Sequence, residues 1–141
     1  MSNSLPSPTD TRHAADLGGG FVVSADTIEM LMELGGEDDP ELLEELIHLY
    51  LDDSRVRVKI LGDALDGGDL EAIGRSAHAL KSASANIGAL CFADVCREIE
   101  TYANAGDSAR VQELVGRGQA MHGEVEAVLR ILLRKPEGVS E

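Results

Sequence analysis

The chain has 141 residues, a formal net charge of −14, and 43% hydrophobic but only 3% aromatic residues. This length suits one domain with its own core and is too short for separate catalytic and regulatory domains. The negative charge disfavours nucleic acids and anionic membranes as partners, and no apolar run is long enough to cross a bilayer or to act as a secretion signal. We therefore expect a soluble, cytoplasmic, monomeric protein with a core of aliphatic side chains, as in helical proteins.

Polar segments without apolar periodicity flank the predicted domain. Residues 1–20 mix Ser, Pro, Thr, Asp and Gly, and residues 135–141 are polar and contain a proline. Such segments cannot bury enough apolar surface to become ordered by themselves. We expect both to be flexible tails around one domain over residues 21–134.

Two helices are predicted in the first half of the domain. A short N-terminal helix begins after Ser24, which is a favourable N-cap, and ends at Gly35. The second helix has Asp39 as its predicted N-cap and Pro40 at its first helical position. Its apolar residues recur at helical spacing until Gly67 ends it.

Three more helices are predicted after the first two. The third begins after Asp69 and ends near Gly88, the fourth runs from about Ala89 to Gly106, and the last begins at Asp107. Short polar connections between long amphipathic helices favour antiparallel neighbours. The predicted fold is therefore all-α, an antiparallel up-down four-helix bundle with a short additional N-terminal helix.

His78 in the third predicted helix lies away from the apolar face of that helix. An α-helix turns by roughly 100° per residue. The apolar face passes through Ile73, Ala77 and Leu80, so His78 is predicted to face solvent. An exposed imidazole is unprotonated and nucleophilic in much of the population near neutral pH. An exposed histidine on a helix is more often a surface residue without a specific function, but the residues around His78 favour a function.

The residues one or two turns from His78 on the same stripe are small or cationic, namely Gly74, Arg75, Lys81, Ser82 and Ala85. Small side chains would leave room for a flat partner surface, and Gly74 in mid-helix costs up to about 1 kcal/mol relative to Ala. We predict that Gly74, Arg75, Ser82 and Ala85 form a docking face. A nucleophilic imidazole can accept a phosphoryl group. Lys81 is positioned to neutralise the negative charge of such a group on His78, and Arg75 is the second candidate for this role.

The segment His78–Ala89, HALKSASANIGA, resembles the signature of the histidine phosphotransfer (HPt) family, which is roughly H-x-L-K-G-x-S/A, then a hydrophobic residue before G-A. The resemblance extends over about residues 21–133. It implies a four-helix bundle in which His78 is the phosphoacceptor and Lys81 its electrostatic partner. One departure is Ser82, which stands where the family often has glycine. Its hydroxyl would either crowd a docking receiver domain or donate a hydrogen bond to a phosphoryl oxygen.

The resemblance predicts a histidine phosphotransfer protein of a two-component phosphorelay. His78 would accept a phosphoryl group from one receiver-domain aspartate and pass it to another, as a phosphotransfer intermediate without autokinase activity. The expected partners are response-regulator receiver domains, with a hybrid histidine kinase as a further candidate. No cofactor is expected, because no cluster of carboxylates surrounds His78 and the required Mg²⁺ would be held by the receiver domain.

Two alternative functions use the same fold. A scaffold or inhibitor would bind receiver domains or kinases without carrying phosphate, but the pairing of His78 with Lys81 argues against it. A metal-binding bundle is suggested by Glu45 and His48, which lie one turn apart as in di-iron carboxylate sites. Such sites need a second pair of this kind, which the sequence lacks, so no metal site is predicted.

Overall fold

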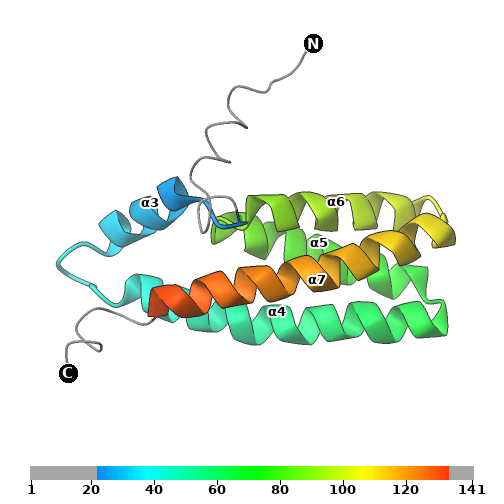
Figure 1. Ribbon diagram of the computed structural model, residues 1–141, viewed down its shortest axis with the longest axis horizontal. Coiled ribbons are helices and arrows are strands. Elements are labelled where there is room, and N and C mark those ends of the chain that lie inside the picture. Colours follow the sequence, from blue (N-terminus) through cyan, green and yellow to red (C-terminus); the bar gives the residue numbers. More distant parts are fainter. Residues whose placement is uncertain (1–21, 134–141) are drawn as a thin grey trace, which may run out of the picture.

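The structure is a computed structural model that describes residues 22–133. Within this range it contains five α-helices and no strand (Figure 1). The helices are α3 (Ala25–Gly35), α4 (Leu42–Gly67), α5 (Leu70–Asn86), α6 (Leu90–Asn104) and α7 (Ser108–Leu133). The tails predicted for residues 1–20 and 135–141 lie outside the described residues, and the domain limits at 21 and 134 stay predictions.

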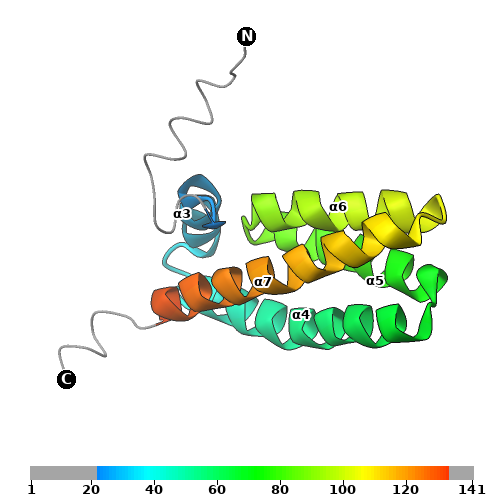
Figure 2. The ribbon, with the colours of Figure 1, turned by 45° about the vertical axis from the view of Figure 1, so that its right-hand side comes forward.

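Helices α4 to α7 form an antiparallel up-down bundle. α4 packs against α5 and α7, and α6 packs against the same two helices, so the four helices enclose one core. Figures 1 and 2 show them side by side, with the connecting turns at the two ends. α3 lies outside this bundle at one end (Figure 1). The predicted fold class, an all-α four-helix bundle with a short additional N-terminal helix, is confirmed.

Three helices, α3, α5 and α7, begin within one residue of their predicted starts. The side-chain oxygens of Ser24, Asp69 and Asp107 each accept a hydrogen bond from the backbone N–H three residues later, at 3.2, 3.1 and 3.1 Å. Each bond satisfies one of the N–H groups that the first turn of a helix leaves without an intrahelical partner. These polar residues therefore fix the starts of α3, α5 and α7.

The predicted start of α4 is wrong. Asp39 and Pro40 were expected as N-cap and first helical residue, whereas α4 begins at Leu42 after Glu41. The Asp39 carbonyl accepts from the N–H of Leu42 at 3.1 Å, and the Asp39 N–H donates to the Gly35 carbonyl at 2.9 Å, so this stretch is a turn. Leu42 also packs onto Gly35, where an added Cβ would lie 2.9 Å from the Leu42 Cβ. The turn and this contact together place the end of α3 against the start of α4.

The core consists mainly of aliphatic side chains from all four bundle helices. The largest fully buried side chains are the aromatic Phe92 and aliphatic residues that include Ile47, Leu61, Ile73, Leu80, Ile99, Leu114 and Leu129. Burying each such side chain contributes about 1.5–3 kcal/mol relative to leaving it exposed. Hydrophobic packing therefore holds α5 and α6, which carry the candidate site, in one fixed arrangement.

Two hydrogen-bonded pairs place polar atoms inside this core. The Tyr50 hydroxyl lies 2.8 Å from Ser84 Oγ, and Ser54 Oγ lies 2.8 Å from His122 Nε2. Burial is the main cause that raises the pKa of Tyr50 to about 12, and burial also lowers the pKa of His122. The partners satisfy these buried polar groups, which would otherwise destabilise the fold. The pairs connect α4 to α5 and α4 to α7.

Gly88 joins α3 to the turn between α5 and α6. Its carbonyl accepts a hydrogen bond from the backbone N–H of Ser24 at 2.8 Å. Its φ of +92° is rarely adopted by residues with a side chain, and an added Cβ would lie 2.9 Å from the Cβ of Thr27. Glycine is therefore required here both by the backbone conformation and by the close approach of α3.

Candidate functional site

His78 projects from α5 into solvent, with 61% of its side chain exposed. Its Nδ1 atom lies 2.9 Å from Oε2 of Glu100 on the neighbouring helix α6. The exposure predicted from the periodicity of this helix is confirmed. The contact with Glu100 comes from a different helix, so one ring nitrogen of His78 is held by the bundle itself.

Glu100 binds two side chains of α5 at once. Its Oε2 atom accepts from His78, and its Oε1 atom accepts from Nζ of Lys81 at 3.1 Å. Partial burial acts to raise the pKa of Glu100, but the hydrogen bonds from Lys81 and His78 outweigh that effect and lower the pKa overall. Glu100 is therefore a carboxylate at neutral pH and a pure acceptor.

The Glu100 carboxylate determines which nitrogen of His78 can react. An ionised carboxylate can only accept, so Nδ1 of His78 must carry the proton of their hydrogen bond. In the neutral imidazole the other nitrogen, Nε2, then has the free electron pair. The geometry therefore presents a nucleophilic nitrogen that is oriented by a carboxylate and exposed to an approaching partner.

Gly74 lies in the contact between α5 and α6, so its predicted position is wrong. It was expected on the exposed stripe beside His78, but it is buried. An added Cβ would lie 3.2 Å from the side-chain oxygen of Asn104 and 3.8 Å from the Cβ of Ala103. The absent side chain thus lets α5 and α6 approach each other. His78 lies four residues after Gly74, and Glu100 lies four residues before Asn104. Because the two helices are antiparallel, His78 therefore lies opposite Glu100.

Glu100 is the site residue that the sequence analysis missed. The residues close to His78 along the chain all belong to α5, whereas Glu100 lies on α6. A usable signal was present, because His78 and Glu100 lie equally far before and after Ala89, next to the glycine turn. In an antiparallel helix pair, residues equidistant from the turn lie at the same level. Such a count identifies a level in the bundle, but it does not show which side chains meet.

The other predicted docking residues remain on the surface of α5. Arg75, Ser82 and Ala85 are all exposed. The Arg75 guanidinium lies 3.4 Å from the Glu71 carboxylate, toward the N-terminal end of α5. Arg75 is therefore directed away from the level of His78, and Lys81 is the cation that the structure brings into the His78–Glu100 group.

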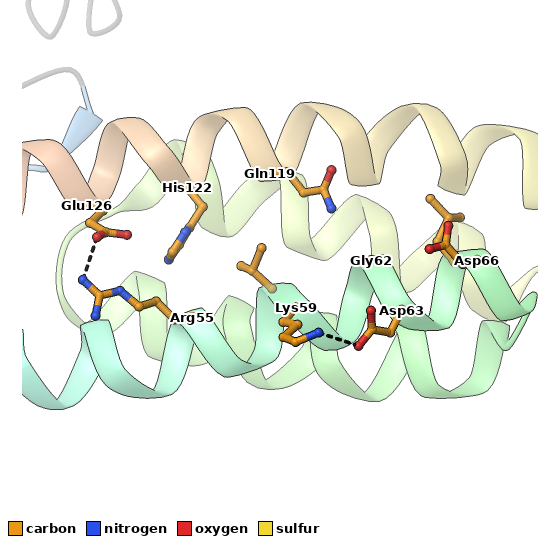
Figure 3. Close-up of a pocket in the computed structure, with 10 residues that line it drawn as sticks. Arg55, Lys59, Gly62, Asp63, Asp66, Gln119, His122 and Glu126 are labelled. Atoms are coloured by element: carbon orange, nitrogen blue, oxygen red, sulfur yellow. Dashed lines mark hydrogen bonds and ion pairs between the residues drawn. The ribbon is translucent and has the colours of Figure 1, made fainter.

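A groove on the other side of the bundle is separate from this site. It lies between α4 and α7, has a volume of about 550 Å³ and contains His122 in its wall. Figure 3 shows its two ion pairs, Arg55 with Glu126 at 2.6 Å and Lys59 with Asp63 at 3.1 Å. Four of the charged residues that line the groove form these two pairs, and Asp66 is the other one, so charges of both signs are mixed along it.

The part of the chain that the structure describes contains neither a metal-binding cluster nor a membrane-spanning helix. His48, the candidate from the metal-binding alternative, is exposed on α4. Among residues 22–133, no group of three or more His, Cys, Asp or Glu side chains could hold a metal ion. None of the helices in this range combines the length and apolar character needed to cross a membrane.

Residues 45–132 match the Hpt domain family, and this match covers α5, α6 and the His78–Glu100 contact. The chain belongs to the Hpt domain family. It is therefore a histidine phosphotransfer protein of a two-component phosphorelay. The predicted family resemblance is confirmed.

Individual relatives agree with this assignment. The chain is 32% identical over 98 residues to the phosphorelay protein LuxU of Vibrio vulnificus strain YJ016. LuxU of strain CMCP6 gives the same identity, and each match spans 69% of this chain and 82% of LuxU. The crystal structure of histidine-containing phosphotransfer protein B from Pseudomonas aeruginosa PAO1 is similar with a TM-score of 0.70 and 28% identity, covering 77% of this chain and 91% of that one. The X-ray structure of a putative histidine-containing phosphotransfer protein from rice has a TM-score of 0.75 and 15% identity, and the match covers 93% of this chain and 95% of that one. At this low identity the likeness supports the fold alone.

Proposed function

We propose that this Hpt protein accepts a phosphoryl group on Nε2 of His78 from a receiver-domain aspartyl phosphate and passes it to a second receiver aspartate. The observation that carries the proposal is the exposed imidazole whose Nδ1 atom is held 2.9 Å from Glu100. An orienting carboxylate fixes the ring and leaves Nε2 directed to the partner. The name of the LuxU relative, a phosphorelay protein, agrees with such a role.

The transfer step is an exchange between two bonds to phosphorus. A new N–P bond forms at Nε2 of His78 while the O–P bond of the aspartyl phosphate breaks, and its electron pair leaves with the aspartate carboxylate. The phosphorylated ring keeps its Nδ1 proton and becomes positively charged, and the Glu100 carboxylate balances this charge. Lys81 lies beside the same group and supplies a cation for the phosphoryl oxygens, because stabilisation of their charge is the main requirement of phosphoryl transfer.

The partners in this proposal are receiver domains, with a hybrid histidine kinase as one source of phosphate. Arg75, Ser82 and Ala85 would line the docking face around His78, while Gly74 is excluded from it because it is buried. The protein would act in the cytoplasm as a monomeric phosphotransfer intermediate without autokinase activity. It needs no cofactor of its own in this scheme, since the receiver domain supplies Mg²⁺.

The test is phosphotransfer from a purified, radiolabelled phospho-receiver in the presence of Mg²⁺. We expect the wild-type protein to acquire a label that is stable in base and labile in acid, and His78→Gln to remain unlabelled. His48→Gln is the matched control, because it removes another exposed helical histidine and should leave labelling unchanged. Incubation with ATP alone should give no label.

Two outcomes would contradict the proposal. Label that persists in His78→Gln would exclude His78 as the phosphoacceptor. Binding of the receiver without any label in the wild-type protein would favour the alternative of a scaffold or inhibitor that uses the same surface.

A further inference from the structure

Ser82 is the residue of the His78 surface whose role the sequence leaves open. It is exposed on α5, four residues after His78 in a continuous helix. Residues at this spacing have their Cβ atoms about 5–6 Å apart. A phosphoryl group on Nε2 would extend the His78 side chain further from the helix, to a length at which its oxygens can approach a neighbouring side chain. The hydroxyl therefore lies within reach of the transferred group.

The direction of helical side chains favours contact between Ser82 and the phosphoryl group. Each Cα–Cβ bond of an α-helix tilts toward the N-terminus of the helix. Lys81 and Ser82, which follow His78, therefore lean toward it. Arg75, which precedes His78, leans away and contacts Glu71 instead.

Lys81 and Ser82 lie on different sides of His78. At roughly 100° per residue, Lys81 is rotated by about 60° to one side of His78 and Ser82 by about 40° to the other. The contact of Lys81 with Glu100 shows that the Lys81 side faces α6. Ser82 is therefore on the outer side, away from the carboxylate that holds Nδ1.

The Ser82 hydroxyl is also available as a donor. Serine and threonine side chains inside helices often bond to a carbonyl of the preceding turn. Thr101 on α6 does so, with its hydroxyl 3.0 Å from the carbonyl oxygen of Arg97. Ser82 forms no such bond with any residue between 22 and 133.

We propose that the Ser82 hydroxyl donates a hydrogen bond to a phosphoryl oxygen on Nε2 of His78. Ser82 would thus be a further catalytic residue that acts on the outer side of the phosphoryl group, opposite Lys81. The inference rests on the proposed function of His78. The hydroxyl keeps its proton throughout, so the N–P and O–P bond changes of the transfer step are unaltered. A hydrogen bond to a charged oxygen is stronger than one between neutral groups, and it stabilises both the transition state and the phosphohistidine.

The experiment compares Ser82→Ala, Ser82→Gly and Ser82→Thr in the receiver phosphotransfer assay. If Ser82 is a donor, Ala and Gly each lower the transfer rate and the equilibrium level of phosphohistidine by about threefold to tenfold, whereas Thr keeps both near wild type. The dissociation constant for the unphosphorylated receiver should be the same for Ser82→Ala as for wild type. Ser108→Ala is the control, because it removes an exposed serine hydroxyl at the start of α7, outside the docking face, and it should leave the transfer rate and the phosphohistidine level at wild-type values.

The opposite order of the variants would overturn the inference. If Ser82 only crowds the receiver, Gly and Ala speed transfer and tighten receiver binding, while Thr weakens both. Wild-type rates in Ser82→Ala would also refute a donor role. Failure of the proposed function gives a different result, in which the wild-type protein takes no label or His78→Gln keeps it, whatever residue stands at position 82.

Discussion

His78 and His122 carry the same imidazole group but lie in opposite environments of one bundle. The His78 side chain is 61% exposed and contacts the Glu100 carboxylate, whereas His122 is 6% exposed and contacts the Ser54 hydroxyl. Each ring has one nitrogen held by a neighbouring helix. The difference lies in what surrounds the rest of the ring, which is solvent for His78 and the packed core for His122.

This difference in environment suits His122 to packing the core and His78 to reacting with a partner. The ring of His122 lies 5.5 Å from that of Phe92, and burial lowers its pKa, so it stays neutral in the core. His78 keeps one ring nitrogen available at the surface, where a carboxylate can balance the positive charge of a phosphorylated ring. Access for a partner and a nearby counter-charge therefore distinguish the candidate phosphoacceptor from a histidine that packs the core.

The largest effect that the comparison predicts is the loss of stability on removing His122. His122→Ala leaves a cavity beside Phe92 and removes the shorter of the two hydrogen bonds of the Ser54 hydroxyl, so we expect the free energy of unfolding to fall by about 2–4 kcal/mol. Urea unfolding followed by circular dichroism measures this change. Phosphotransfer to the folded variant should persist, because His122 lies outside the candidate site.

His78→Ala provides the matched control for this measurement. The side chain of His78 is exposed, so its removal should change the free energy of unfolding by less than about 0.5 kcal/mol. A large loss of stability in His78→Ala, or a negligible one in His122→Ala, would contradict the separation of roles. Ser54→Ala and the double variant would then show how much of the His122 effect belongs to their hydrogen bond.

A smaller effect is expected from Lys81. Lys81→Ala removes the cation beside the phosphoryl site, so we expect transfer from a phospho-receiver to slow by about tenfold, or about 1.4 kcal/mol in activation free energy. Rapid-quench measurements of the transfer rate test this. Lys59→Ala is the control, since Lys59 also pairs with a carboxylate but lies in the groove between α4 and α7. Equal rates for both variants would remove Lys81 from the mechanism.

Sequence periodicity predicted the features that a single helix determines, and it failed where two helices meet. The exposure of His78 and the caps Ser24, Asp69 and Asp107 depend on residues within a few positions along the chain. The burial of Gly74 depends on its neighbours in α6, which the spacing within α5 does not contain. For the same reason, counting from the turn at Ala89 places Glu100 at the level of His78, but it does not show that the two side chains meet.

The core position of His122 could have been recognised from its spacing. His122 follows Val115 by seven residues and precedes Val125 by three, so it belongs to the apolar stripe of α7. A polar residue on such a stripe needs a partner in the core. The sequence does not show which residue supplies it, because Ser54 lies on α4 and meets His122 only after the bundle has formed.

The smallest predicted effect is the pH dependence that His122 gives to stability. Its pKa is lowered in the folded state, mainly by burial and partly by Arg55, while Glu126 acts in the opposite direction. The unfolded chain, with a histidine pKa near 6.5, therefore binds more protons than the folded one as the pH falls below that value. Between pH 7.5 and 5.5 the contribution of His122 to the free energy of unfolding should fall, by at most about 1.4 kcal/mol. Urea unfolding at both pH values measures this loss, and His122→Leu should remove it while His48→Gln leaves it in place. If His122→Leu kept the full pH dependence, His122 would not be its source.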